Sequence, residues 1–117
     1  MKYAVLDTNF ILSCVRKKIN FFDEIAFMGR SVIIPKQVIV ELGGLSKSKP
    51  EARTALLILE KNKFKKVTLH GRNVDNGIVK LANENEGYVI ATLDREMQNR
   101  IKNRKLIIRG DKRLEVI

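Results

Sequence analysis

The sequence is poor in the residues on which several classes of protein depend. Its one cysteine, Cys14, excludes an internal disulfide framework and fits a reducing compartment. Its one histidine, His70, leaves no catalytic triad and no histidine-rich zinc site within a single chain. No apolar run approaches the roughly 20 residues that cross a bilayer, and Asp7 interrupts the apolar run nearest the N-terminus. We therefore expect a cytoplasmic protein with neither a signal peptide nor a membrane role.

Glycine-rich phosphate-binding motifs are also missing. Neither G-x-x-x-x-G-K-[ST] nor G-x-G-x-x-G is present, so P-loop and dinucleotide-binding interpretations lose their main support. Acidic residues are scarce beside basic ones, because 13 Asp and Glu stand against 23 Lys and Arg, a formal net charge of +10. Such an excess favours a polyanionic partner, either nucleic acid or an anionic membrane surface, of which the membrane is the less favoured. The alternative is a lysine-rich coat that serves solubility.

The basic residues fall into three clusters along the chain. The clusters are Arg16–Lys18; Lys61, Lys63, Lys65 and Lys66; and, in the C-terminal quarter, Arg95, Arg100, Lys102, Arg104, Lys105, Arg109, Lys112 and Arg113. Contacts of such side chains with phosphates give a salt-dependent affinity that is mostly independent of base sequence. We expect nucleic-acid contacts from the last cluster, at Arg95, Arg100, Lys102, Arg104 and Lys105. The alternative for any one cluster is a solvated surface.

Apolar periodicity alternates along the chain between the spacing of strands and that of helices. Strands are predicted at Lys2–Leu6, Ser31–Ile34, Lys65–Leu69, Tyr88–Thr92 and Lys105–Ile108, with a short sixth at Leu114–Ile117. Helices are predicted after caps at Asp7–Asn9 and Asn20, over Lys36–Leu45 and Glu51–Lys61, from Val74 toward Gly87, and over Asp94–Lys102. This order predicts one α/β layered domain over residues 1–117, with parallel neighbours in its sheet and Cys14 in its core.

Four acidic residues stand beside apolar runs, at places that such a sheet brings together. Asp7 ends the first strand, Asp94 follows a later strand by two residues, Asp75 begins a helix and Glu41 lies within one. Ligands of parallel sheets bind beyond the carboxyl ends of the strands, where we expect all four acids to converge. Crowded carboxylates repel one another, and a divalent cation is their simplest partner. The pattern therefore predicts a metal-dependent enzyme.

Each acid also has a structural explanation that needs no metal. Asp7 could cap the first predicted helix, while Asp75 and Asp94 could stabilise the N-termini of theirs. Glu41 has no capping role and could be an exposed residue on the flank of its helix. Taken together, four placements at one end of the sheet favour a single site over four separate explanations.

The ordered segments Val5–Asn9, Val40–Leu42, Val74–Asp75 and Ala91–Asp94 resemble those of PIN-domain nucleases over nearly the whole chain. The resemblance implies a three-layer α/β/α fold with a short, mainly parallel central sheet, and a ribonuclease activity. It also implies that one or two Mg²⁺ or Mn²⁺ ions lie between the acids at Asp7, Glu41, Asp75 and Asp94. Oxygen ligands of this kind suit both metals, and two ions about 4 Å apart can activate water and stabilise a leaving oxygen.

The resemblance carries further expectations about supporting residues and partners. Asn9 and Thr92 match polar positions that support the acids by hydrogen bonding. The segment after Asp94 is similar to PIN proteins of ribosomal RNA processing, and toxin nucleases of the VapC type share the acids. The implied partners are RNA, a ribosomal precursor or an antitoxin protein, and a second copy in a homodimer. One departure is Asn76, which stands where many members of the family carry a second acid beside the one matching Asp75.

These observations lead to two functional hypotheses of different kinds. The first is a metal-dependent endoribonuclease, in which Asp7 and Asp94 hold the principal metal and Asp75 and Glu41 complete the site or orient the water. The second is a non-catalytic PIN module that binds RNA or the ribosome, which Asn76 favours because it removes one negative charge. A phosphohydrolase of another family would expect an Asp-x-Asp start, whereas this chain has Asp7–Asn9.

Overall fold

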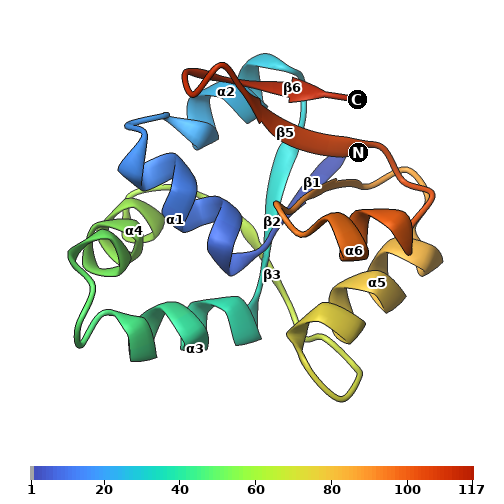
Figure 1. Ribbon diagram of the computed structural model, residues 1–117, viewed down its shortest axis with the longest axis horizontal. Coiled ribbons are helices and arrows are strands. Elements are labelled where there is room, and N and C mark those ends of the chain that lie inside the picture. The colour runs from blue at the N-terminus through green and yellow to red at the C-terminus, as the bar shows by residue number, and fades with distance from the viewer. Residues whose placement is uncertain (1) are drawn as a thin grey trace.

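The computed structural model describes residues 2–117, in which strands and helices alternate as the sequence predicts (Figure 1). The strands are β1 (Tyr3–Leu6), β2 (Ser31–Pro35), β3 (Lys65–Val67), β4 (Val89–Ala91), β5 (Lys105–Arg109) and β6 (Arg113–Val116). The helices are α1 (Thr8–Arg16), α2 (Phe21–Phe27), α3 (Lys36–Leu45), α4 (Pro50–Glu60), α5 (Val74–Glu84) and α6 (Arg95–Asn99).

The strands form one sheet in the order β3-β2-β1-β4-β5-β6. Strands β1 to β5 are parallel to their neighbours, and β6 returns antiparallel to β5. Because the first five strands point the same way, their carboxyl ends share one edge of the sheet and their amino ends share the other. We call the first the carboxyl edge, and it consists of the segments that come directly after Leu6, Pro35, Val67 and Ala91. We call the second the amino edge, and it consists of the first residues of β1, β2 and β3 and the segments directly before them.

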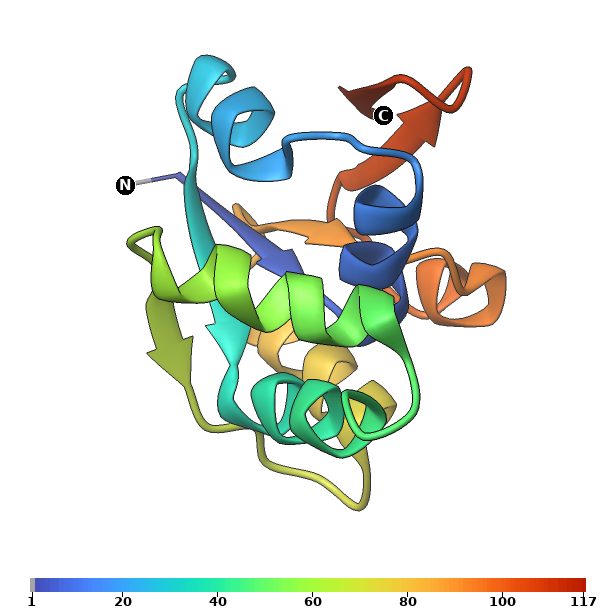
Figure 2. The same ribbon diagram turned by 90° about the vertical axis from the view of Figure 1, so that its left-hand side faces the viewer.

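Helices cover both faces of the sheet and make three layers (Figure 1). Alternate residues of β1 point to opposite faces, so Ala4 and Leu6 join one apolar cluster and Val5 joins another. The first cluster packs under α1, α2, α3 and α4, and Figure 2 shows α3 and α4 in front of the sheet. The second cluster packs against α5 and α6 through Ile78 and Met97. The predicted three-layer α/β/α fold with a short, mainly parallel sheet is confirmed.

Cys14 lies in the first of these clusters and is fully buried, as the sequence predicts. Burial raises the pKa of its thiol to about 12, with a smaller contribution from the nearby charge of Glu24. The thiol therefore stays protonated at neutral pH, and its contribution is to packing.

Strand β3 and helix α6 both end earlier than the sequence pattern predicts. The strand expected to reach Leu69 ends at Val67, and the Leu69 N–H and C=O bond instead to the Gln37 amide, both at 3.1 Å. The helix expected to reach Lys102 ends at Asn99. The buried Asn103 amide then donates to two carbonyl oxygens of the loop between α5 and β4, which fixes the turn into β5.

None of the helices in residues 2–117 combines the length and the apolar character that a membrane crossing requires.

Candidate nuclease site at the carboxyl edge

Asp7 occupies the junction between β1 and α1 and is held there by its own backbone and side chain. Its N–H donates to the Ala91 carbonyl of β4 at 3.1 Å, continuing the sheet by one residue. Its Oδ1 accepts from the Phe10 N–H at 2.9 Å, so that Asp7 is the N-cap of α1. The side chain is buried, with 7% of the residue exposed. The carboxylate therefore has a fixed position at the centre of the carboxyl edge.

The surroundings of Asp7 raise the pKa of its carboxyl group above the ordinary value of 3.8. Burial is the largest cause, because removal from water disfavours the charged form. Hydrogen bonds with the Thr92 hydroxyl and the Phe10 N–H act in the opposite direction, and the negative charges of Asp75 and Glu41 raise the pKa further. Three predicted site acids thus share one electrostatic neighbourhood, with Asp7 buried at its centre.

Glu41 lies exposed on α3, and its Oε1 accepts a hydrogen bond from the Thr8 hydroxyl. Thr8 is the buried first residue of α1, immediately after Asp7. The sequence presents Thr8 only as part of a capping segment, so this contact between α1 and α3 is missed there. Adjacency to Asp7 is the signal that could have drawn attention to it. The hydroxyl fixes the direction of the Glu41 carboxylate at the rim of the site.

Asp75 lies exposed in the first turn of α5, and two close contacts position that turn. Gln37, on the first turn of α3, clamps the backbone of Leu69 through two hydrogen bonds. Gly77, on the second turn of α5, packs against Leu69 so closely that a Cβ there would lie 2.7 Å from the Leu69 Cβ. The helix therefore approaches the end of β3 because residue 77 has no side chain. Sequence reasoning missed both Gln37 and Gly77.

Asp94 lies at the start of α6 and is its N-cap, since its Oδ1 accepts from the N–H groups of Glu96 and Met97 at 2.9 and 3.2 Å. Thr92 connects it to the centre of the site. The fully buried Thr92 hydroxyl accepts from the Asp94 N–H at 3.1 Å and is hydrogen-bonded to the Asp7 carboxylate. The ends of β1 and β4 are thus joined through one hydroxyl group.

The four acids differ in how closely the structure brings them together. Asp7 interacts electrostatically with Glu41 and with Asp75, whereas Asp94 is linked to Asp7 through Thr92 and has its carboxylate engaged as a helix cap. Within residues 2–117, no three Asp, Glu, His or Cys side chains stand close enough together to enclose one metal ion.

Charge and ligand chemistry nevertheless fit a divalent cation at this edge. The ion pairs of residues 2–117 join Lys17 to Asp111 and Arg109 to Glu115, so neither neutralises an acid of the predicted site. Carboxylate and hydroxyl oxygens are the hard ligands that Mg²⁺ and Mn²⁺ prefer. Asp7 in particular is a buried carboxylate that faces two further negative charges, and a cation would relieve both the desolvation and the repulsion. The donor set therefore fits the group that the sequence predicts.

The remaining predicted residues surround this edge at different depths. Asn9 lies exposed on the first turn of α1, and its role as a supporting residue stays a prediction. Asn76, next to Asp75, accepts a hydrogen bond from Arg100 Nη2 at 2.9 Å. The basic residue Arg100 is thereby tied directly beside the acids. Arg95, Lys102 and Arg104 are exposed, and Lys105 is half-buried and donates to the Ile101 carbonyl at 3.2 Å.

Comparisons with known proteins identify the family of the chain. The rRNA-processing protein fcf1 of Schizosaccharomyces pombe is 28% identical over 102 residues, which cover 86% of this chain and 53% of that protein. This chain thus spans about half the length of fcf1. Ribonuclease VapC4 of Methanocaldococcus jannaschii is 28% identical over 127 residues, covering 99% of this chain and 97% of that protein.

A solved structure of the PIN domain endonuclease Utp24 superimposes with a TM-score of 0.80 and 25% identity, covering 97% of this chain and 90% of that one. A family profile described as a PIN like domain matches residues 4–110, which include all four predicted acids. The two comparisons agree on the fold and on nearly the whole length of the chain. The chain therefore belongs to the PIN-like domain family.

Proposed function

We propose that this protein is a metal-dependent endoribonuclease that hydrolyses RNA phosphodiester bonds at a site formed by Asp7, Glu41, Asp75 and Asp94. The observation that carries the proposal is the state of Asp7. It is a buried carboxylate at the end of a parallel strand, it faces two other carboxylates, and neither ion pair in residues 2–117 neutralises it. Membership of the PIN-like family supports nuclease chemistry. The charge arrangement around Asp7 supports the need for a bound cation.

The side chains would divide the work as expected from the sequence. Asp7, fixed by Phe10 and Thr92, and Asp94 would hold the principal Mg²⁺ or Mn²⁺. A bound divalent cation would neutralise charge on the phosphate and lower the pKa of a water molecule. Glu41, directed by Thr8, and Asp75 lie at the exposed rim, where they would complete the site or orient the attacking water. The water oxygen forms the new bond to phosphorus as the bond to the leaving ribose oxygen breaks.

The substrate class follows from charge and from the relatives. The net charge of +10 supports binding of a polyanion, and Arg100 beside Asn76 places one positive charge next to the acids. The similarity to fcf1 favours a role in ribosomal RNA processing, with a ribosomal precursor as partner. The similarity to VapC4 favours a toxin ribonuclease with an antitoxin as partner. A homodimer and a cytoplasmic location are part of the same proposal.

The second candidate is a non-catalytic PIN module that binds RNA or the ribosome. Two observations favour it. Asn76 lowers the negative charge of the site and is occupied by Arg100, and no three metal-ligating side chains of residues 2–117 are within reach of one ion. Such a module would bind RNA with the same dependence on salt and would not cut it.

Cleavage of RNA by the purified protein distinguishes the two candidates. We expect cleavage with Mg²⁺ or Mn²⁺, none with a chelator, and a loss of at least about 100-fold in the Asp7→Asn variant. Asp111→Asn is the matched control, because Asp111 is exposed and pairs with Lys17 away from the site. Equal cleavage by the parent and Asp7→Asn would refute the nuclease proposal, and RNA binding without cleavage in the parent would favour the non-catalytic module.

A further inference from the structure

A cavity of about 470 Å³ lies at the amino edge, at the opposite end of the strands from the acids. It is lined by Phe22 and Ala26 of α2, by Arg30, and by residues at or just before the starts of β1, β2 and β3. Phe22 belongs to the apolar cluster that packs under α3 and α4. Three cations line it, namely Arg30, Lys63 and Lys65, and no Asp or Glu does so among the described residues. The cavity is therefore strongly positive, and its volume is that of a small-molecule site.

Arg30 is the most informative of these residues. Its Nη1 atom is buried and has no hydrogen-bond partner. No other buried side-chain nitrogen or oxygen in the non-exposed residues of the range 2–117 lacks a partner. A buried polar group without a partner costs free energy, and more so when it is charged. A guanidinium group binds phosphate or carboxylate oxygens through paired N–H donors. The unused donor of Arg30 therefore indicates an anion as the missing partner.

Aromatic rings line the same cavity. Phe22 of α2 and Phe64, just before β3, lie with their ring centres 6.3 Å apart. Lys65 Nζ lies 5.3 Å from the centre of the Tyr3 ring, within the range of a cation–π contact. Cations together with flat apolar surfaces suit a ligand that has both a phosphate and a planar base.

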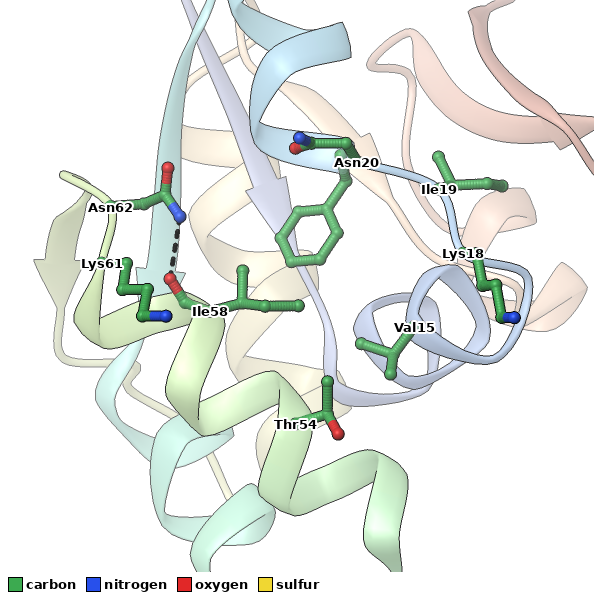
Figure 3. Close-up of a pocket in the computed structure, with 9 residues that line it drawn as sticks. Val15, Lys18, Ile19, Asn20, Thr54, Ile58, Lys61 and Asn62 are labelled. Atoms are coloured by element: carbon green, nitrogen blue, oxygen red, sulfur yellow. Dashed lines mark hydrogen bonds between the residues drawn. The ribbon is translucent and has the colours of Figure 1, made fainter.

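A second cavity differs from this one because its side-chain amides already have hydrogen-bond partners within the protein. It measures about 380 Å³ and lies between α1, α2 and α4 (Figure 3). Asn62 donates to the Ile58 carbonyl at 2.8 Å, and Asn20 caps α2 by accepting from the Asp23 N–H. These amides already have partners within the protein, whereas Arg30 Nη1 has none.

We propose that the amino-edge cavity is a nucleotide-binding subsite that takes one nucleotide of a single-stranded RNA. Its phosphate would bind Arg30 and Lys63, and its base would lie against Phe22 and Phe64. The five residues of β2 separate the two edges by about 16 Å at about 3.3 Å per residue, so the bound nucleotide is not the one being cut. The choice of RNA rests on the proposed function, and the subsite would give the enzyme a second hold on a strand that passes along the sheet.

Binding of a short single-stranded oligoribonucleotide in chelator tests the subsite without any cleavage. Fluorescence anisotropy of the parent is compared with Arg30→Gln and with the matched control Arg53→Gln, an equal loss of charge at an exposed arginine on α4. We expect Arg30→Gln to weaken binding about tenfold, because a charged hydrogen-bonding group is lost, and Arg53→Gln to weaken it much less. Titration with adenosine monophosphate, followed by NMR, should shift the ring signals of Phe22 and Phe64 in the parent.

Equal affinity of the Arg30→Gln and Arg53→Gln variants would overturn the subsite, whether or not the protein cuts RNA. Conversely, a parent that binds RNA through Arg30 and cleaves nothing would keep the subsite and refute only the nuclease proposal. Arg30→Gln should fold, because Nη1 has no hydrogen bond to lose. If Arg30→Gln does not fold, Lys63→Gln takes its place, with Lys47→Gln as the exposed control. We expect Lys63→Gln to bind the oligoribonucleotide about threefold more weakly than the control. Equal affinity of these two variants would overturn the subsite.

Discussion

The carboxyl edge and the amino edge belong to one sheet and carry opposite charges. Strands β1 to β4 each lead into the N-terminus of a helix at the carboxyl edge, whereas α2, α4 and α5 end before β2, β3 and β4 at the amino edge. Helix N-termini stabilise negative charge and C-termini stabilise positive charge. Asp7, Asp75 and Asp94 stand at helix N-termini and Glu41 stands in the middle of α3, whereas Arg30, Lys63 and Lys65 follow the C-terminal ends of α2 and α4. The parallel topology thus separates the charges of the two sites before any ligand is present.

Two acids at the carboxyl edge serve the fold and the proposed site together. Asp7 and Asp94 are helix caps, as the metal-free explanation predicts, and they are also the acids that the site requires. Capping uses one oxygen of each carboxylate, since Oδ1 is the acceptor in both. Capping itself therefore leaves the other oxygen of each carboxylate unused. The structural and functional explanations of these two acids are therefore compatible.

Gly77→Ala should disturb the packing at the carboxyl edge and leave the amino edge unchanged. Of the variants considered, it should lower the free energy of unfolding the most. The added Cβ would lie 2.7 Å from the Leu69 Cβ, and Gln37 holds the Leu69 backbone in place. Overpacking costs roughly 1–3 kcal/mol and the gain in helix propensity returns up to about 1, so we expect a net loss of about 1–2 kcal/mol in the free energy of unfolding.

Chemical denaturation measures this loss, and Gly44→Ala provides the control. Gly44 lies in α3 with no atom within 4 Å of an added Cβ, so alanine there should stabilise the protein by up to about 1 kcal/mol. If Gly77→Ala proves as stable as Gly44→Ala, the close approach of α5 to Leu69 does not position Asp75.

Asn76→Asp should strengthen metal binding at the carboxyl edge, because it adds one negative charge there. We expect the affinity for Mn²⁺, measured by calorimetry, to increase about three- to tenfold. The positive charge of the neighbouring Arg100 offsets part of the added negative charge and so reduces this increase. Asn83→Asp makes the same charge change on the exposed C-terminal part of α5, about 10 Å along the helix, and should have little effect. An equal increase in both variants would mean that overall charge, not the site, attracts the metal.

Most of the fold was predictable because it depends on local patterns. Short apolar runs specify strands that are buried on both faces, and Asp7, Asn20 and Asn73 are capping residues whose effect stays within one turn. The common location of the four acids was also predictable, since the carboxyl ends of parallel strands lie at the same edge of the sheet. Their separation from one another was not, because it depends on side-chain conformations across four helices.

The features that the sequence did not reveal all join residues far apart in the chain. The Gln37 amide clamps Leu69, the Thr8 hydroxyl meets Glu41, and Gly77 admits the Leu69 side chain. None of these residues has a neighbourhood that predicts its partner. Arg30 belongs to the same group, because its lack of a partner exists only once α2 and the amino edge have packed together.

The most direct test of a cation site around Asp7 is the thermal unfolding of the parent and of Asp7→Asn, each with chelator and with Mn²⁺. In chelator, Asp7→Asn should be at least as stable as the parent, since asparagine caps helices equally well and carries no buried charge. Mn²⁺ at ten times its dissociation constant should stabilise the parent by about 1.4 kcal/mol, about 5 °C in Tm, and leave Asp7→Asn unchanged. The same shift in both proteins would contradict a metal site centred on Asp7.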